Sequence, residues 1–181
     1  MCGIIAYTGT QPVMPILRDG LKRLEYRGYD SSGVSVISRK KLKTTKTAGK
    51  LDQLESKVDT SIDSHCGIGH TRWATHGAPT DENAHPHTDT TSRYAIVHNG
   101  IIENIEALKA TLPKGTKYTS ETDSEVIAHL LVQNDGELID AVQAVLKQVI
   151  GTYGLAVIDN QYPNTIAVSY THLTLPTKRI V

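Results

Sequence analysis

The stretch MCGIIAYTG, residues 1–9, places a cysteine directly after the initiator methionine and ahead of an apolar run. Residues 4–8 are predicted to form a strand. A single cysteine beside a strand is most often a small buried hydrophobe. If Met1 is removed, Cys2 instead carries a thiol and a free α-amine with a pKa of roughly 7.7–8.0, and this amine can serve as the thiol's general base. The stretch alone leaves both interpretations open.

The composition restricts the class of protein before any further motif is considered. The chain has 181 residues, a length that suits one domain, and its 19 Lys and Arg balance its 19 Asp and Glu. This balance argues against nucleic acid or an anionic membrane as a partner, and no apolar stretch is long enough to cross a bilayer. Two cysteines, Cys2 and Cys66, build no disulfide framework. We therefore expect a cytoplasmic globular protein with no nucleic-acid or membrane partner.

Hydrophobic periodicity predicts short strands mixed with helices in non-alternating order. Further strands are predicted at residues 34–38, 65–72, 94–100, 155–159 and 165–168, with an exposed edge strand at 39–46. Helices are predicted at residues 12–26, 51–58, 102–112, 123–134 and 136–150. Residues 73–93 contain almost no aliphatic side chains, and a loop of that length in a compact domain is usually functional or mobile. This order indicates an α+β sandwich rather than a doubly wound parallel sheet.

The motif HTRWATHG, residues 70–77, concentrates an arginine, a tryptophan and two histidines at the start of that loop. In the simpler interpretation Arg72 is a surface cation and Trp73 a partly buried aromatic. Arginine also offers a planar fork that binds a carboxylate through two hydrogen bonds. A tryptophan beside it could cover a small ligand and exclude water.

Two further motifs have a structural and a chemical interpretation each. In HNG, residues 98–100, Asn-Gly is a strong tight-turn signal, but the Asn99 amide and the Gly100 N–H could also form an oxyanion hole. In SETD, residues 120–123, the polar residues are typical of a helix N-terminus. Asp123 could alternatively pair with the ammonium group of a ligand.

The histidines raise the question of a metal site, and NAHPH, residues 83–87, holds two of them at a chelating-looking spacing. No carboxylate or cysteine pattern completes a known zinc arrangement. We therefore expect solvated or hydrogen-bonded histidines, no metal and no cofactor. The histidines considered are His65, His70, His76, His85, His87, His98 and His129.

Taken together and in order, the motifs MCGI, LEYRGYDSSG, HTRWATHG, NAHPH, HNGIIEN and SETDSEV resemble the class II glutamine amidotransferases. The resemblance covers about residues 1–168 and is most specific to the glutaminase domains of the hexosamine-forming members. It implies an N-terminal nucleophile fold, in which two antiparallel sheets pack face to face between helix layers.

The resemblance also implies a role for each matching residue. Met1 is removed, Cys2 attacks the side-chain amide of L-glutamine, and Asn99 and Gly100 form the oxyanion hole. Arg72 binds the α-carboxylate of glutamine and Asp123 its α-ammonium group. The remaining residues are expected to line or position the substrate pocket: Arg27, Trp73, Thr75, His76 and Gly77.

The C-terminal end departs from the family pattern. Residues 169–181, SYTHLTLPTKRIV, resemble nothing in the family. We therefore expect a truncated amidotransferase domain at residues 2–168, followed by an unrelated tail with few native contacts. Complete members add isomerase domains that bind fructose 6-phosphate, and they are expected to be homo-oligomeric. Two alternatives remain: a domain of another class II amidotransferase, or a silent fragment that keeps only the fold or glutamine binding.

Overall fold

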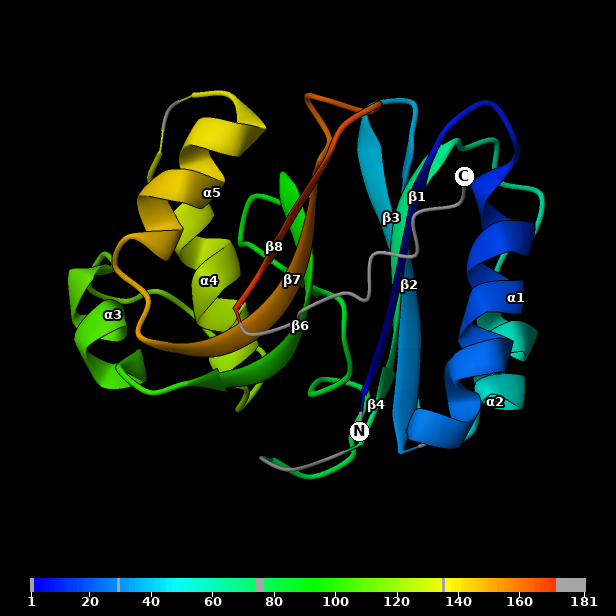
Figure 1. The fold of residues 1–181 in the computed structure, drawn as a ribbon, viewed down its shortest axis with the longest axis horizontal. Coiled ribbons are helices and arrows are strands. Elements are labelled where there is room, and N and C mark those ends of the chain that lie inside the picture. The colour runs from blue at the N-terminus through cyan, green and yellow to red at the C-terminus, as the bar shows by residue number, and fades with distance from the viewer. Residues whose placement is uncertain (1, 29, 74–76, 135, 172–181) are drawn as a thin grey trace, which may run out of the picture.

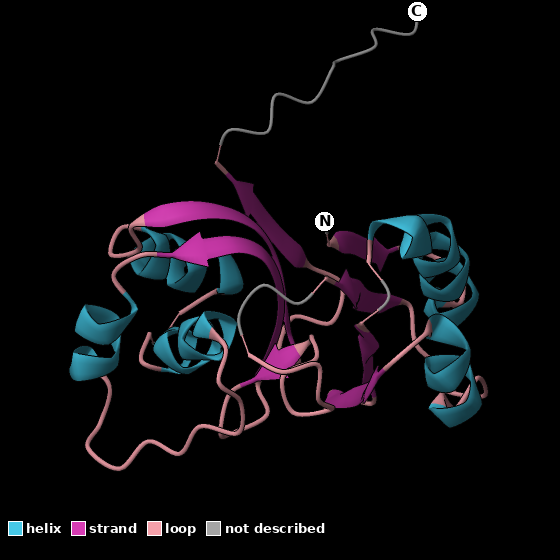
Figure 2. Cartoon of the chain, turned by 90° about the horizontal axis from the view of Figure 1, so that it is seen from below, coloured by secondary structure: helices cyan, strands magenta, loops and turns pink. Residues whose placement is uncertain are grey.

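The computed structural model describes residues 2–28, 30–73, 77–134 and 136–171 (Figure 1). Two four-stranded antiparallel sheets face each other, and helices cover the outer face of each sheet (Figures 1 and 2). This arrangement confirms the α+β sandwich of two antiparallel sheets between helix layers. Within the described ranges, none of the helices combines the length and the apolar character needed to span a lipid bilayer.

The first sheet has the strand order β1-β4-β2-β3. Its strands are β1 (Gly3–Thr8), β2 (Ser31–Ser38), β3 (Lys41–Ala48) and β4 (Cys66–Arg72). Every residue of the central strand β4 is buried, whereas β3 lies at the sheet edge with mostly exposed or half-buried residues. The charged sequence of β3 suits that place, because charges on an edge strand discourage pairing with other chains. The predicted edge strand is therefore confirmed.

The second sheet has the order β5-β6-β7-β8. Its strands are β5 (His87–Thr88), β6 (Tyr94–Ile102), β7 (Gly151–Asp159) and β8 (Ile166–Tyr170). Apolar side chains from both sheets meet between them in one cluster, which includes Ile68 of β4, Val97 of β6 and Ile158 of β7. Burial of this shared cluster holds the sheets face to face.

The helices pack on the outside through the apolar faces that the periodicity predicts. They are α1 (Val13–Leu24), followed by the short 3₁₀ helix η1 (Glu25–Arg27), α2 (Leu51–Lys57), α3 (Ile105–Thr111), α4 (Asp123–Val132) and α5 (Leu138–Leu146). α1 and α2 cover the first sheet, while α3, α4 and α5 lie on the outer face of the second (Figure 1). α4 is buried along almost its whole length, which fixes its first residue, Asp123, relative to β6.

Several predicted boundaries are wrong. Asn99 and Gly100 lie inside β6 rather than in a turn, and Ile102 ends that strand rather than starting a helix. The two-residue strand β5 lies within the predicted loop. α5 is shorter than residues 136–150, since it ends at Leu146.

The start of the expected tail also differs from the prediction of few native contacts. Ser169 and Tyr170 continue β8 and pair with Leu155 and Gly154 of β7. Thr171 donates its backbone N–H to the Tyr153 carbonyl at 2.8 Å, and its hydroxyl accepts the Tyr153 N–H at 2.9 Å. The prediction of few contacts is therefore wrong for residues 169–171, and residues 172–181 lie outside the described residues.

Candidate active site

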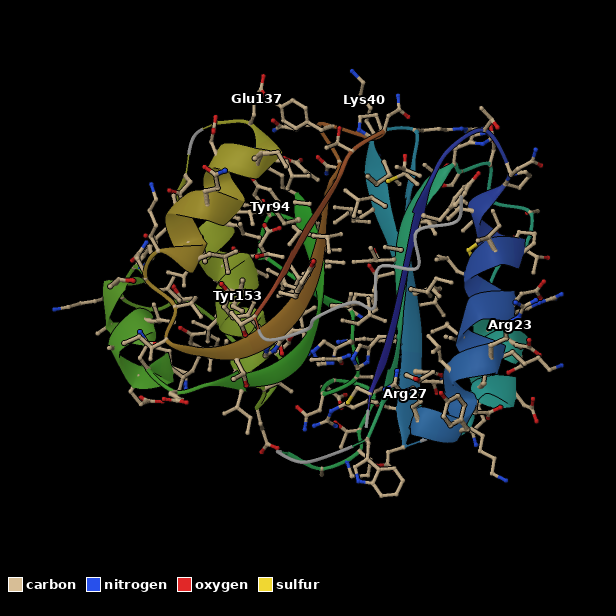
Figure 3. All side chains as sticks on the ribbon, in the orientation of Figure 1. Arg23, Arg27, Lys40, Tyr94, Glu137 and Tyr153 are labelled. Atoms are coloured by element: carbon tan, nitrogen blue, oxygen red, sulfur yellow. The ribbon has the colours of Figure 1, made fainter. Side chains whose placement is uncertain are left out.

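A cavity of about 730 Å³ lies between the two sheets. Seven of the sequence-predicted site residues line it: Cys2, Arg27, Arg72, Trp73, Asn99, Gly100 and Asp123. Figure 3 labels Arg27 and Tyr153, which border the cavity from η1 on one side and β7 on the other. Part of the wall is apolar, where Ile4 and Ala6 of β1 and Ala156 of β7 contribute to the apolar cluster between the sheets.

Cys2 lies immediately before β1, at the end of the strand pair β1–β4. The register pairs Gly3 with Thr71, which brings Cys2 beside the end of β4. The Trp73 backbone N–H points at the Cys2 sulfur at 3.3 Å, and the Trp73 carbonyl lies 3.6 Å from the same sulfur. An N–H donor at this distance stabilises the thiolate form, which is the nucleophilic form of cysteine.

Arg72 is the last residue of β4 and is buried, with 5% of its surface exposed. Its guanidinium donates to the carbonyls of Gly77 and Ala78, each at 3.4 Å. Burial lowers the pKa of Arg72, while Cys2, Asp30 and Asp123 oppose that shift. Because arginine stays protonated well above neutral pH, Arg72 brings a partly desolvated cation to the cavity wall.

Asp123 is the first residue of α4, as the SETD motif predicts. Its Oδ2 accepts the backbone N–H of Ile102 at 2.9 Å, and its Oδ1 accepts the hydroxyl of Ser124 at 3.2 Å. These two bonds fix the plane of the carboxylate at the end of β6. The side chain keeps 26% exposure, so a cationic group in the cavity can reach it.

Asn99 and Gly100 lie on β6 facing Cys2. The Asn99 side-chain nitrogen donates to the Cys2 carbonyl at 3.4 Å, and its oxygen lies 2.8 Å from His70 Nε2. Gly100 has a φ of +138°, and a Cβ there would lie 1.9 Å from the Thr152 carbonyl oxygen. Glycine is therefore required at this point of the strand.

The other predicted pocket residues are placed differently. Gly77 is outside the cavity lining and instead lies behind Arg72, whose guanidinium it binds through its carbonyl. Thr75 and His76 lie outside the described residues. Ser124, Tyr153 and Tyr170 line the cavity without having been singled out in the sequence. Of these three, only Ser124 could have been found from the sequence, because its hydroxyl lies next to the candidate ligand-binding residue Asp123.

Five of the seven histidines are buried and hydrogen-bonded or ion-paired, which is the hydrogen-bonded rather than the solvated form of the expectation. They are His70, His85, His87, His98 and His129. Burial lowers the pKa of His70 to about 4, and it also lowers the pKa of His98 although Asp123 opposes that shift. Among the described residues, no three His, Cys, Asp or Glu side chains are grouped so that they could hold a metal ion.

Comparisons with known proteins identify the family to which the chain belongs. Residues 55–169 match the family described as "Glutamine amidotransferase domain". The chain therefore belongs to the glutamine amidotransferase domain family.

The names of individual relatives are more specific than the description of the family. The chain is 49% identical over 170 residues to a glutamine–fructose-6-phosphate aminotransferase [isomerizing] of Symbiobacterium thermophilum. It is 51% identical over 169 residues to the enzyme of the same name from Aquifex aeolicus. Each alignment covers 92% of this chain and 28% of the relative, so the chain spans little more than a quarter of these relatives' length.

Solved structures show the same fold. The glutamine phosphoribosylpyrophosphate amidotransferase from B. subtilis superimposes with a TM-score of 0.78 and 25% sequence identity. That superposition covers 94% of this chain and 37% of the amidotransferase. The N-terminal nucleophile sandwich expected from the sequence is thus confirmed.

Proposed function

We propose that this chain hydrolyses the side-chain amide of L-glutamine to glutamate and ammonia. The observation that carries the proposal is the meeting of Cys2, Arg72 and Asp123 at one cavity. A cation and an anion there complement the two charged ends of an amino acid, while a thiol lies where a side chain can reach it.

In this proposal Arg72 binds the α-carboxylate of glutamine and Asp123 binds its α-ammonium group. Trp73, which lines the cavity and is 44% exposed, covers the bound side chain, whereas Gly77 acts only through its carbonyl, which binds Arg72. Arg27 lines the same cavity as Cys2 and, in this proposal, helps to hold the nucleophile's end of the site. The bonds that orient Asp123, from Ile102 and Ser124, support its role, because a carboxylate with a fixed plane recognises a cation with less loss of entropy.

The chemistry proceeds in two steps. After removal of Met1, the α-amine of Cys2 accepts the thiol proton, and the thiolate attacks the amide carbon of glutamine. The developing oxyanion is stabilised by Asn99 Nδ2 and the Gly100 N–H. The C–N bond then breaks, the ammonium form of the Cys2 amine returns the proton to the leaving nitrogen, and ammonia departs from a γ-glutamyl thioester. Water attacks that thioester, which releases glutamate and regenerates the thiol.

The names of the relatives suggest the wider reaction. We propose that the ammonia serves glucosamine 6-phosphate synthesis from fructose 6-phosphate, with the acceptor site built by segments outside these 181 residues. A homo-oligomeric, cytoplasmic whole protein fits this proposal. The same relatives disfavour a domain of another class II amidotransferase.

The deciding experiment measures glutamate release from L-glutamine by the wild-type chain and by Cys2→Ala, after intact mass has shown that Met1 is absent. We expect Cys2→Ala to lose the activity. Cys66→Ala is the matched control, because Cys66 is buried in the core between the sheets and should leave the rate near wild type. Equal rates for wild type and Cys2→Ala would defeat the proposal and favour a silent fragment.

A further inference from the structure

A group of four buried histidines from β4, β5, β6 and the segment before β5 lies against the cavity, and two of them, His85 and His98, line it. His70 stacks on His85 with ring centroids 4.3 Å apart, and His87 meets His85 edge-on at 4.5 Å. One ring nitrogen of each of His70, His85, His87 and His98 has no hydrogen-bond partner within the described part of the chain. Such a buried polar group is costly, so a reason for its presence is required.

His70 is the member of this group that contacts Asn99. Its Nε2 lies 2.8 Å from Asn99 Oδ1. His70 is fully buried in the central strand β4, where its backbone pairs with Ile4 of β1 and Gly33 of β2. The backbone is therefore held on both sides by strands and the buried ring is stacked on one face by His85, so its Nε2 has little freedom to move.

The hydrogen bonds around Asn99 identify the position of the His70 proton. Asn99 Nδ2 donates to the Cys2 carbonyl, which leaves Oδ1, an acceptor, facing His70. Burial lowers the pKa of His70 to about 4, so the ring is neutral at pH 7 and carries one proton. That proton must be on Nε2, since a bare nitrogen would face the Asn99 oxygen with a second lone pair. The nitrogen left bare is then Nδ1, which is the His70 atom without a partner among the described residues.

This orientation matters because the two ends of an asparagine amide are nearly the same size. Rotated by half a turn, Asn99 would present an oxygen rather than an N–H to a developing oxyanion, and would repel it. We propose that His70 is a positioning residue that holds the Asn99 amide with its nitrogen toward the nucleophile. The inference rests on the proposed glutaminase function and adds to it a residue that does not line the cavity.

The test compares kcat and KM for glutamine hydrolysis in the full chain. His70→Leu removes the donor and keeps much of the volume, while His70→Gln restores a donor at a similar reach. We expect His70→Leu to lower kcat by about tenfold or more, with KM close to wild type. The upper limit of the loss is the roughly 10²–10³-fold cost of removing one oxyanion donor altogether. His70→Gln should recover a large part of the rate. His87→Leu is the matched control, since His87 is equally buried but bonds Thr122 Oγ1, and it should keep kcat near wild type.

A double-mutant cycle separates positioning from a general structural role. If His70 acts through Asn99, His70→Leu should lower kcat far less in an Asn99→Ala background than in the wild type. An equal loss in both backgrounds, or an unchanged kcat in His70→Leu, would overturn the proposal.

A measurement on the wild-type chain distinguishes a failure of this inference from a failure of the proposed function. It needs no variant, so it does not depend on whether a variant folds. Long-range ¹H–¹⁵N NMR correlations report which ring nitrogen of His70 is protonated. We expect the Nε2–H tautomer, and an Nδ1–H tautomer would overturn the positioning role. If the wild-type chain releases no glutamate, the proposed function fails, while the tautomer still shows whether His70 orients Asn99.

Discussion

The Asn83 side chain ties the loop after Trp73 to the segment that leads into α4. Its Oδ1 accepts the backbone N–H of Glu121 at 2.8 Å, and its Nδ2 donates to the Ala78 carbonyl at 3.0 Å. Ala78 also accepts a bond from Arg72, and Glu121 lies two residues before Asp123. Asn83 thus connects the two parts of the chain that carry the proposed cation and anion of the site.

Asn83→Ala should therefore weaken glutamine binding. Loss of these bonds leaves the part-buried Glu121 N–H without its acceptor, which costs about 0.5–1.5 kcal/mol of stability, and lets Arg72 and Asp123 separate. We expect KM for glutamine to rise several-fold with a smaller change in kcat, measured by steady-state glutamate release. Asn160→Ala is the control, because Asn160 donates a comparable bond to Ser92 far from the cavity. If both variants change KM equally, the connection has no role in binding.

Ser124→Ala should act on Asp123 alone among the proposed groups. The Ser124 hydroxyl donates to Asp123 Oδ1 and lies 2.8 Å from His98 Nδ1 and 2.9 Å from His85 Nε2. Without it, one carboxylate oxygen loses its fixed partner, and we expect KM for glutamine to rise about tenfold, equivalent to roughly 1.4 kcal/mol of binding. In an Asp123→Asn background the same substitution should raise KM little further. An additive rise would contradict an effect transmitted through Asp123.

Much of the fold could be predicted from the sequence because each helix has one apolar face and each strand has a local apolar run. The motif HTRWATHG likewise led to Arg72, since few residues other than arginine bind a carboxylate in that way. The error at Asn99 and Gly100 has a physical cause. Asn-Gly favours a turn locally, but pairing with Gly154 and Tyr153 of β7 keeps the two residues extended within β6.

The histidine group could not be predicted, because its members come from separate strands and share no spacing along the chain. His70 on β4, His98 on β6 and His85 before β5 become neighbours only when the two sheets face each other. Ser124 gave no signal beyond its place beside Asp123, since a serine at that point is typical of a helix N-terminus in any protein. Tertiary contacts, rather than local propensity, determine what these residues do.

Gly100→Ala should damage the site more than its small size suggests. The new Cβ would lie 1.9 Å from the Thr152 carbonyl oxygen, at a φ of +138° that side chains rarely adopt. β6 must then shift at the proposed oxyanion hole, and we expect a stability loss of about 1–3 kcal/mol together with a large loss of kcat. Gly115→Ala is the control, because Gly115 also has a positive φ, +90°, but a Cβ added there would have no described atom within 4 Å. Thermal unfolding and glutamate release measure the two effects. Equal losses of kcat in both variants would contradict the assignment.

Glu125 should make the stability of the chain depend on pH in the acidic range. Burial alone would raise its pKa, but hydrogen bonds from His129, Ser120 and Thr119 outweigh that effect and hold the pKa far below the ordinary value of 4.5. A carboxyl group with a lower pKa in the folded state stabilises the fold above its unfolded pKa, and this contribution is lost as pH falls. Stability from Glu125 should thus be complete at pH 7 and decline below about pH 4.5.

Glu125→Gln tests this dependence. The variant loses the charge that accepts the N–H and hydroxyl groups of Thr119 and Ser120, and a hydrogen bond to a charged group contributes about 1.5–3 kcal/mol. We expect it to be less stable than wild type by at least about 2 kcal/mol at pH 7, with the difference shrinking as pH falls below 4.5, in urea unfolding across that range. Glu106→Gln, at an exposed site paired with Lys109 three residues on, should change stability by less than about 0.5 kcal/mol at any pH. A difference for Glu125→Gln that stays constant down to about pH 3 would show that shape, rather than charge, accounts for its contribution.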